Sequence, residues 1–299
     1  MVQPQTTITP VPGFRGLHRL GRGALRFARK QPLGLAGILM VLIVIAGAIF
    51  APILGTGDPN MDDFTIRLRG PSGAYWFGTD EYGRDLWTRI LFGARISLEV
   101  GFISVFTGSL LGLAIGVATG YVGGATDTIT ERLVEIMLSI PAIVLALALM
   151  AALGSGVDKV IIAIAITFLP RTIRIMRGTV LSVKENVYIE AARAIGASTP
   201  RIMFRHILPN VMAPYLIVAS SLLGAAILTE ATLSFLGLGI PPPHPSWGRM
   251  LAGNLMSYAV SAPWMVVFPG LALSVIVLGF NLFGDALRDI WDPRLRGRL

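Results

Sequence analysis

Long apolar stretches separated by charged segments are the dominant pattern along this chain. A helix that crosses the hydrocarbon core of a bilayer needs about 20 mostly apolar residues, and residues 32–54 reach that length without a charged side chain. Five later stretches are similarly apolar and carry at most two charges each. The pattern therefore predicts about six membrane-spanning helices, at residues 32–54, 98–121, 133–153, 160–176, 211–231 and 264–283.

Small residues and prolines refine three of these predicted spans. Glycine occurs at every fourth position from Gly108 to Gly120, so these glycines share one helix face, along which a second helix can pack closely. Pro141 lacks a backbone N–H donor and predicts a kink in the third span. Pro170 and Arg171 interrupt the fourth stretch, which is therefore the weakest of the predicted spans.

Lysine and arginine residues in the connecting segments predict how the chain crosses the membrane, because short cytoplasmic loops are enriched in both. Residues 1–31 contain six basic and no acidic residues, and residues 171–210 contain seven basic residues. Residues 55–97, in contrast, balance five arginines with six acidic residues. We therefore expect both termini and the 171–210 connection on the cytoplasmic side. The spacing of the N-terminal arginines also predicts an interfacial helix on anionic lipid, or else a disordered basic tail.

Composition narrows the functional classes. The chain has 299 residues, of which 54% are hydrophobic and 14% charged, and its mean hydropathy of +0.70 requires lipid rather than a soluble core. Its net charge of +8 does not predict a nucleic-acid partner, because the basic residues lie between apolar runs rather than on one water-facing surface. Without cysteine there is no thiolate chemistry, and the three histidines lie too far apart in sequence to predict a metal site.

Sequence motifs of catalysis are also missing. None of the three lysines lies in a glycine-rich phosphate loop. Neither a serine nucleophile elbow nor a pair of catalytic carboxylates within one span is found. We therefore predict that the chain is not an enzyme, has no catalytic residue and binds no cofactor of its own. Any energy for transport must then come from a partner or from an ion gradient.

The connection between the fourth and fifth predicted spans contains the most informative pattern. Residues 190–195 are good helix formers, and Gly196 after them is a candidate C-cap. Ser198 or Thr199 can cap a second helix, and Pro200 suits the first turn of that helix. The sequence therefore predicts two short helices that meet at a tight corner on the cytoplasmic side.

This corner resembles the EAA loop of permease subunits in bacterial binding-protein-dependent ABC importers. The matching residues are Glu190, Ala191, Ala192, Gly196, Ile207, Leu208 and Pro209. The resemblance implies that the corner docks into a cleft on an ATPase subunit, with Glu190, Ala191, Ala192, Gly196 and Ala197 as the coupling residues. It also implies that Glu190 faces a basic partner and that Ile207, Leu208 and Pro209 support the loop. The alternative for Glu190 is a cap on its own helix.

Three other segments, at residues 77–98, 230–239 and 280–289, resemble the C-type subunit of the dipeptide, oligopeptide and nickel branch of these importers. Glu135 stands where that branch leads us to expect aspartate. The resemblance runs from about residue 30 to the end and implies an all-α integral membrane fold, with one N-terminal helix before a five-helix type I importer core. The implied division is a basic cytoplasmic segment 1–31, a first transmembrane helix with an extracytoplasmic loop 32–96, a core permease domain 97–284 with its coupling loop at 177–210, and a cytoplasmic tail 285–299.

The same resemblance implies the assembly in which the chain works. Its partners would be a homologous B-type permease, two ABC ATPase subunits that bind ATP and Mg, and an extracytoplasmic substrate-binding protein, all at the bacterial inner membrane. The chain would form half of a translocation pathway for dipeptides or oligopeptides, with nickel complexes, glutathione and oligosaccharides as alternative substrates. An ion-coupled secondary transporter would instead need inverted repeats or midplane ion ligands, and a membrane enzyme would need a polar catalytic constellation; neither pattern is found.

Two groups of charged residues near the predicted spans complete the candidate sites. Glu230 lies roughly 27 Å of helix beyond the start of the fifth span, near its outer boundary. It is a candidate either for lining the translocation pathway or for bonding a neighbouring helix. Asp285, Arg288 and Asp289 have three- and four-residue spacing, which predicts an internal ion-paired face of a helix after the sixth span.

Overall fold

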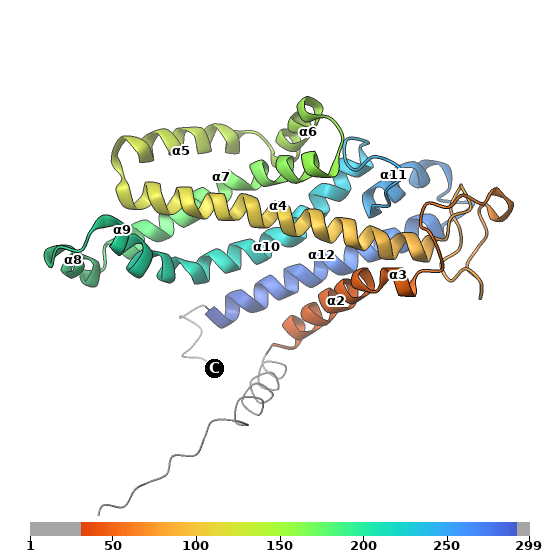
Figure 1. Ribbon diagram of the computed structural model, residues 1–299, viewed down its shortest axis with the longest axis horizontal. Coiled ribbons are helices and arrows are strands. Elements are labelled where there is room, and N and C mark those ends of the chain that lie inside the picture. The colour runs from red at the N-terminus through yellow and green to blue at the C-terminus, as the bar shows by residue number, and fades with distance from the viewer. Residues whose placement is uncertain (1–30, 292–299) are drawn as a thin grey trace, which may run out of the picture.

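Helices form nearly all of the regular structure in the computed structural model, which describes residues 31–291 except for the side chains of residues 254–256 (Figure 1). The elements are α2 (Pro32–Ile49), α3 (Ala51–Leu54), the short 3-10 helix η1 (Phe64–Ile66), α4 (Leu86–Val122), α5 (Gly124–Ser139), α6 (Ala142–Leu153), α7 (Val157–Lys184), α8 (Val187–Ala194), α9 (Thr199–Ile202), the π-helical turn η2 (Met203–Ile207), α10 (Leu208–Phe235), α11 (Trp247–Ser257) and α12 (Trp264–Trp291). The predicted all-α class is confirmed.

The long helices lie side by side along one axis (Figure 1). Helix α4 packs against α7, α10 and α2, and α12 packs against both α2 and α10. The short helices α8 and α9 lie at one end of this bundle, while α11 and the loop between α3 and α4 lie at the opposite end (Figure 1). The chain therefore places its predicted cytoplasmic corner and its predicted outer loop at opposite ends of the membrane-spanning bundle.

Among residues 31–291, α2, α4, α12 and the continuous segment from α9 to α10 are each long and apolar enough to cross a membrane. The bent pair α5 and α6 can form a further span. Helix α7 has 28 residues, enough for a span, but its second half carries Arg171, Arg174 and Arg177. The arrangement agrees with the prediction of about six spans.

Two predicted spans differ from the observed helices in extent. Helix α4 begins at Leu86 rather than at residue 98, because Asp85 caps it with a side-chain bond to the Thr88 N–H at 2.9 Å. Helix α7 runs through Pro170 without a break. The expectation that Pro170 interrupts the fourth span was therefore wrong. A missing N–H removes only one intrahelical bond, and here Pro170 is buried among packed neighbours.

The kink predicted at Pro141 is confirmed and is large. Helix α5 ends at Ser139, Pro141 takes the N-cap position of α6, and the two helix axes differ by 93°. An N-cap proline needs no backbone donor, so the break costs no hydrogen bond at that residue. The third predicted span is therefore two helices rather than one straight rod.

The glycine stripe of α4 packs against α7, as its spacing predicts. A Cβ atom on Gly108 would lie 2.5 Å from the carbonyl oxygen of Ala165, and one on Gly112 would lie 2.7 Å from the Cβ of Thr172. Both distances are shorter than any tolerable contact between such atoms. Only glycine allows the two helix backbones to approach this closely.

The outer loop before α4 is held by polar contacts rather than by regular structure. Arg89 of α4 pairs with Asp80 at 3.4 Å and donates to the carbonyl of Pro59 at 2.7 Å. The Trp264 indole of α12 donates to the carbonyl of Thr79 at 3.2 Å. Burial raises the pKa of Glu81 in the same loop, so this carboxyl group takes up a proton more readily than a solvated glutamate. These contacts bind the outer ends of α4 and α12 together.

The interfacial helix predicted from the arginines of residues 15–29 lies outside the described residues, as does the end of the C-terminal tail, residues 292–299.

Candidate functional site

The corner predicted at Gly196 terminates helix α8. Gly196 has φ +82°, and its N–H donates to the carbonyl of Arg193 at 2.9 Å. The N–H of Ala197 donates to the carbonyl of Ala192 at 3.0 Å. These two bonds form a Schellman motif, in which a left-handed residue closes the helix. Ser198 takes the N-cap position of α9 without a side-chain cap bond, so the helix–corner–helix prediction is confirmed.

One face of the corner is packed into the bundle. The side chains of Ile189, Ile202 and Ile207 have at most 1% exposure, and Ala192 is also buried. The same apolar cluster contains Leu113, Val117 and Tyr121 of α4, Met176 and Val180 of α7, and Val211 and Tyr215 of α10. Because protein interiors are close-packed, a displacement of the corner must move the cytoplasmic ends of these helices with it.

The predicted support residues occupy different environments. Ile207 is fully buried in the apolar cluster under the corner, and Leu208 packs against that cluster with part of its side chain. Pro209 is exposed and lies in the first turn of α10. Ile207 and Leu208 therefore contact the base of the corner, while Pro209 lies on its surface.

The opposite face of the corner is exposed and largely apolar. Ile195 is 87% exposed, Val187 79% and Phe204 71%. Glu190 and Ala191, on α8 with Val187, are also exposed, whereas Phe204 belongs to η2. We call these five residues the corner tip. Val187, Ala191 and Ile195 share one face of the α8 end of the corner through their four-residue spacing, and exposed apolar side chains on one face are typical of a protein contact.

The Glu190 carboxylate has no hydrogen bond or ion pair within residues 31–291. It is therefore not engaged in capping its own helix in this structure.

The apolar part of the corner tip was missed in the sequence. The signal that could have found it is helical spacing: residues 187, 191 and 195 recur at intervals of four and share one face of α8. The buried Ile189 and Ala192 lie on the other face. Helix α8 therefore has apolar residues on two faces. Only one face can pack against the bundle, so the other is available for contact with a partner protein.

Two basic side chains attach the corner to the end of α4. The Lys184 ammonium, at the end of α7, donates to the carbonyl of Tyr121 at 2.7 Å. The Arg193 guanidinium of α8 lies 5.3 Å from the centre of the Tyr121 ring, within the range of a cation–π contact. Tyr121 therefore connects the cytoplasmic end of α4 to the end of α7 and to α8.

Glu230 lies at a second polar site, where α10 passes α4 near their outer ends. Its side chain has no exposed surface. One carboxylate oxygen accepts from the Ser97 hydroxyl of α4 at 3.0 Å, and the other accepts from the Ser234 hydroxyl at 2.7 Å. Of the two alternatives for Glu230, the bond to a neighbouring helix is present in this structure. A role of Glu230 in the translocation pathway stays a prediction.

The ion-paired face predicted for Asp285, Arg288 and Asp289 is not formed. Within residues 31–291, no ion pair joins these side chains, and Asp289 instead accepts a hydrogen bond from the Gln31 amide at 3.1 Å. Helical spacing brings side chains within reach, but it does not determine which of them turn toward each other.

Comparison with known families gives a match over most of the chain. Residues 109–297 match the family described as "Binding-protein-dependent transport system inner membrane component".

Curated relatives cover the chain almost from end to end. A protein of Brucella suis named as a putative peptide transport system permease is 43% identical over 91% of this chain and 91% of its own length. The dipeptide transport system permease protein of Alkalihalophilus pseudofirmus is 43% identical over 92% of this chain and 90% of its own. The glutathione transport system permease protein of Escherichia coli is 42% identical over 90% of this chain and 89% of its own.

A solved structure has a similar fold. A chain from inward-facing structures of the MetNI methionine ABC transporter aligns with a TM-score of 0.57 and 22% sequence identity. The alignment covers 69% of this chain and 97% of that chain. At this identity the likeness concerns the fold alone.

Proposed function

This chain belongs to the family of binding-protein-dependent transport system inner membrane components, and from this premise we propose that its corner couples ATP hydrolysis by partner subunits to movement of the membrane helices. The chain is a permease subunit of an ABC importer in the peptide-transport group. Family membership removes the alternative of an ion-coupled secondary transporter. The observation that supports the coupling role is the corner itself, with its buried base and exposed apolar tip.

Coupling through this corner follows from its place in the chain. Helix α8 directly follows α7, and α9 leads through η2 into α10. A partner that displaces the corner tip therefore moves the cytoplasmic ends of both long helices, because the cluster around Ile189 and Ile207 transmits the displacement. Such a rigid displacement of packed helices is one of the recurrent forms of switching between two states. In this account Glu190, Ala191, Gly196 and Ala197 form the contact with the ATPase subunit, and Ile207, Leu208 and Pro209 support it. Ala192, predicted as a coupling residue, is instead buried against the bundle and supports the corner from that face.

The proposed assembly contains a homologous permease, two ATPase subunits with ATP and Mg, and an extracytoplasmic binding protein. Family membership supports each of these partners in general. This chain would perform no bond chemistry and would form half of the pathway through the inner membrane.

We propose short peptides as the substrate class. Two of the relatives above are named for peptide or dipeptide transport, and a third for glutathione, which is itself a tripeptide. Nickel complexes and oligosaccharides remain alternatives. A screen of the co-purified binding protein against these classes would identify the ligand.

Replacing Glu190 by lysine is expected to lower the rate of substrate-stimulated ATP hydrolysis in the assembled importer by about tenfold, corresponding to about 1.4 kcal/mol of lost contact energy. The side chain is exposed and unpaired within the described residues, so folding should change by less than about 0.5 kcal/mol. ATPase rate and retention of ATPase subunits during purification would both be measured.

The matched control is Glu185→Lys. Glu185 is an exposed acidic residue at the C-cap of α7, five positions before Glu190, and its reversal changes the net charge by the same amount. It should leave both readouts close to wild type. Equal behaviour of the two variants would contradict a specific contact at Glu190.

Both termini are proposed to be cytoplasmic, and one cysteine can test the orientation. The chain has no native cysteine, so Ile195→Cys places a single reactive thiol on the 87% exposed corner tip. A membrane-impermeant thiol reagent should label it in inside-out vesicles and not in right-side-out vesicles. Ala74→Cys, on an exposed position of the outer loop, should give the opposite result. Labelling of the Ile195→Cys variant from the outside would overturn the orientation.

A further inference from the structure

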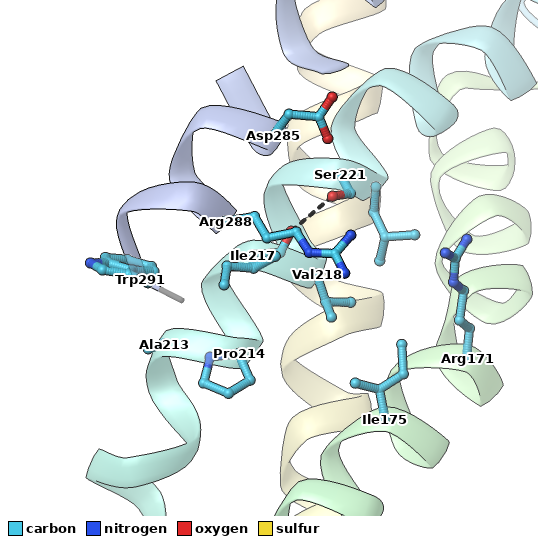
Figure 2. A pocket seen from close by; sticks show the side chains of 11 residues that line it. Arg171, Ile175, Ala213, Pro214, Ile217, Val218, Ser221, Asp285, Arg288 and Trp291 are labelled. Atoms are coloured by element: carbon cyan, nitrogen blue, oxygen red, sulfur yellow. Dashed lines mark hydrogen bonds between the residues drawn. The ribbon is translucent and has the colours of Figure 1, made fainter. Parts of the chain in front are cut away.

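A cavity of about 460 Å³ lies between α7, α10 and α12, away from both the corner and Glu230 (Figure 2). Its wall on α10 runs from Ala213 to Leu222, within the first half of a helix that begins next to the corner at Leu208. The cavity therefore belongs to the cytoplasmic half of the bundle. A volume of this size is within the range of small-molecule sites.

Three charged side chains line this cavity. Arg171 reaches it from α7, and Asp285 and Arg288 reach it from α12. Arg288 extends from α12 past α10 toward the side on which Arg171 lies, and Asp285 lies one turn of α12 away from Arg288 (Figure 2). Within residues 31–291, none of the three forms an ion pair or a side-chain hydrogen bond.

Arg171, Asp285 and Arg288 are all exposed, and Asp285 and Arg288 lie just beyond residue 283, where the sixth predicted span ends. The three charges can therefore face water or a ligand rather than lipid. Most of the remaining residues that line the cavity are apolar. Val218 of α10 and Ile175 of α7 lie below the two guanidinium groups in this view, and Trp291 lies on the side of α12 (Figure 2). An apolar wall with a few convergent polar groups is typical of a site for a small ligand.

We propose that this cavity binds a short peptide by its two charged ends, a step that rests on the proposed transport function. Arginine is well suited to a carboxylate, because its guanidinium donates two parallel hydrogen bonds to the two oxygens. Arg171 and Arg288 thus hold the carboxyl end. Asp285 holds the ammonium end, and its negative charge disfavours a ligand that is only an anion. The apolar wall accepts a side chain of the peptide.

The position of the cavity in the cytoplasmic half of the bundle indicates at which step of transport a peptide would occupy it. A peptide there has already passed the outer half of the bundle and has reached the helices next to the corner. The cavity is then the last site before release into the cytoplasm. Displacement of the corner moves α10, which forms one wall of the site, so ATP-driven movement would change its affinity.

The test uses a thiol inside the cavity. Ser221 lines it and is exposed, and its hydroxyl is bonded only to the carbonyl of Ile217 one turn back, at 3.0 Å (Figure 2). Ser221→Cys therefore adds the single thiol of this chain at the site. In the assembled importer, held in phosphatidylcholine nanodiscs, the rate of labelling by a small thiol reagent is measured with and without alanyl-phenylalanine. At saturation the dipeptide should slow labelling about tenfold, which corresponds to about 1.4 kcal/mol.

Modified dipeptides and arginine variants test which charged groups of the ligand and of the cavity are needed for binding. The C-terminal amide of the same dipeptide and its N-acetyl form should protect much less, because each lacks one charged end. Arg171→Gln in the Ser221→Cys chain should remove the protection by the free dipeptide. Arg174→Gln is the matched control, because Arg174 is exposed one turn further along α7 and does not line the cavity. Protection that survives Arg171→Gln, or that is lost equally with Arg174→Gln, overturns the proposal.

Two other occupants give distinct results. The headgroup of phosphatidylethanolamine carries the same pair of charges, so slower labelling on addition of that lipid alone would assign the cavity to lipid and overturn the peptide site. A thiol that never reacts in the assembled importer, yet reacts in the isolated chain, would assign this face to the second permease and would also overturn it. The assay needs no ATP turnover. Normal ATPase coupling without protection would thus reject this site alone. Protection together with an unchanged ATPase rate in the Glu190→Lys variant would reject the coupling proposal alone.

Discussion

Replacing Gly196 by valine should uncouple ATP hydrolysis from transport while the chain still inserts into the membrane. Gly196 has φ +82° at the end of α8, and an L-residue in the left-handed region costs about 1–2 kcal/mol, more for a β-branched side chain. No atom lies within 4 Å of the position that its Cβ would take, so the cost is backbone strain rather than a clash. The strain is relieved if the Schellman motif opens, which displaces the corner tip. ATPase activity and peptide uptake of the assembled importer would be measured together.

Two controls separate strain from bulk. Asparagine tolerates the left-handed region, so Gly196→Asn should retain most of the coupling although its side chain is as large as valine. Gly178→Val adds the same side chain to an exposed position in α7 with free space around it, and it should leave coupling unchanged. Normal uptake by Gly196→Val would remove the proposed role of the corner geometry.

Replacing Gly112 by leucine should cause the largest loss of stability among the changes considered. Its Cβ would lie 2.7 Å from the Cβ of Thr172 and 3.2 Å from the carbonyl oxygen of Leu169. Because both contacts are on α7, α4 and α7 would have to move apart along their shared interface. Overpacking typically costs about 1–3 kcal/mol, and contact with backbone atoms leaves little room for relaxation. Thermal unfolding of the purified chain in mild detergent should occur several degrees lower, at roughly 2–4 °C per kcal/mol.

Ala114→Leu is the matched control for this loss. Ala114 is two residues along the same helix and is exposed, so the same side chain points away from α7. Its unfolding temperature should stay close to that of the unchanged chain. If Gly112→Leu were equally stable, the α4–α7 interface would not depend on the glycine stripe.

The helix–corner–helix geometry around Gly196 was largely predictable because its determinants are local. Gly196 provides a left-handed residue, and Ser198 with Pro200 begins the next helix, all within five positions. Local backbone preferences of this kind do not depend on distant contacts. The exposure of Ile195 was not predictable in the same way. Whether that side chain faces the bundle or solvent depends on how α8 docks on α4, through Tyr121 and the apolar cluster.

The charged residues near the membrane illustrate the opposite case. Spacing along α12 suggested that Asp285 and Arg288 pair, yet the structure turns both toward a cavity that Arg171 lines from α7. Glu230 finds its partner in Ser97, 133 positions earlier in the chain. Such pairings join residues on different helices, so no periodicity within one helix can reveal them.

By itself the sequence determined the membrane class, the approximate positions of the spans, a close helix contact along the glycine stripe and the corner. Each of these depends on an apolar length, on a missing Cβ atom or on a local backbone preference. Only the tertiary structure decided that α7 packs on the glycine stripe, that the bend at Pro141 reaches 93°, which residue bonds Glu230 and which residues share the cavity. The physical reason is that a helix pattern defines which face is apolar, whereas the packing of several helices decides which faces meet and which charges are left without a partner.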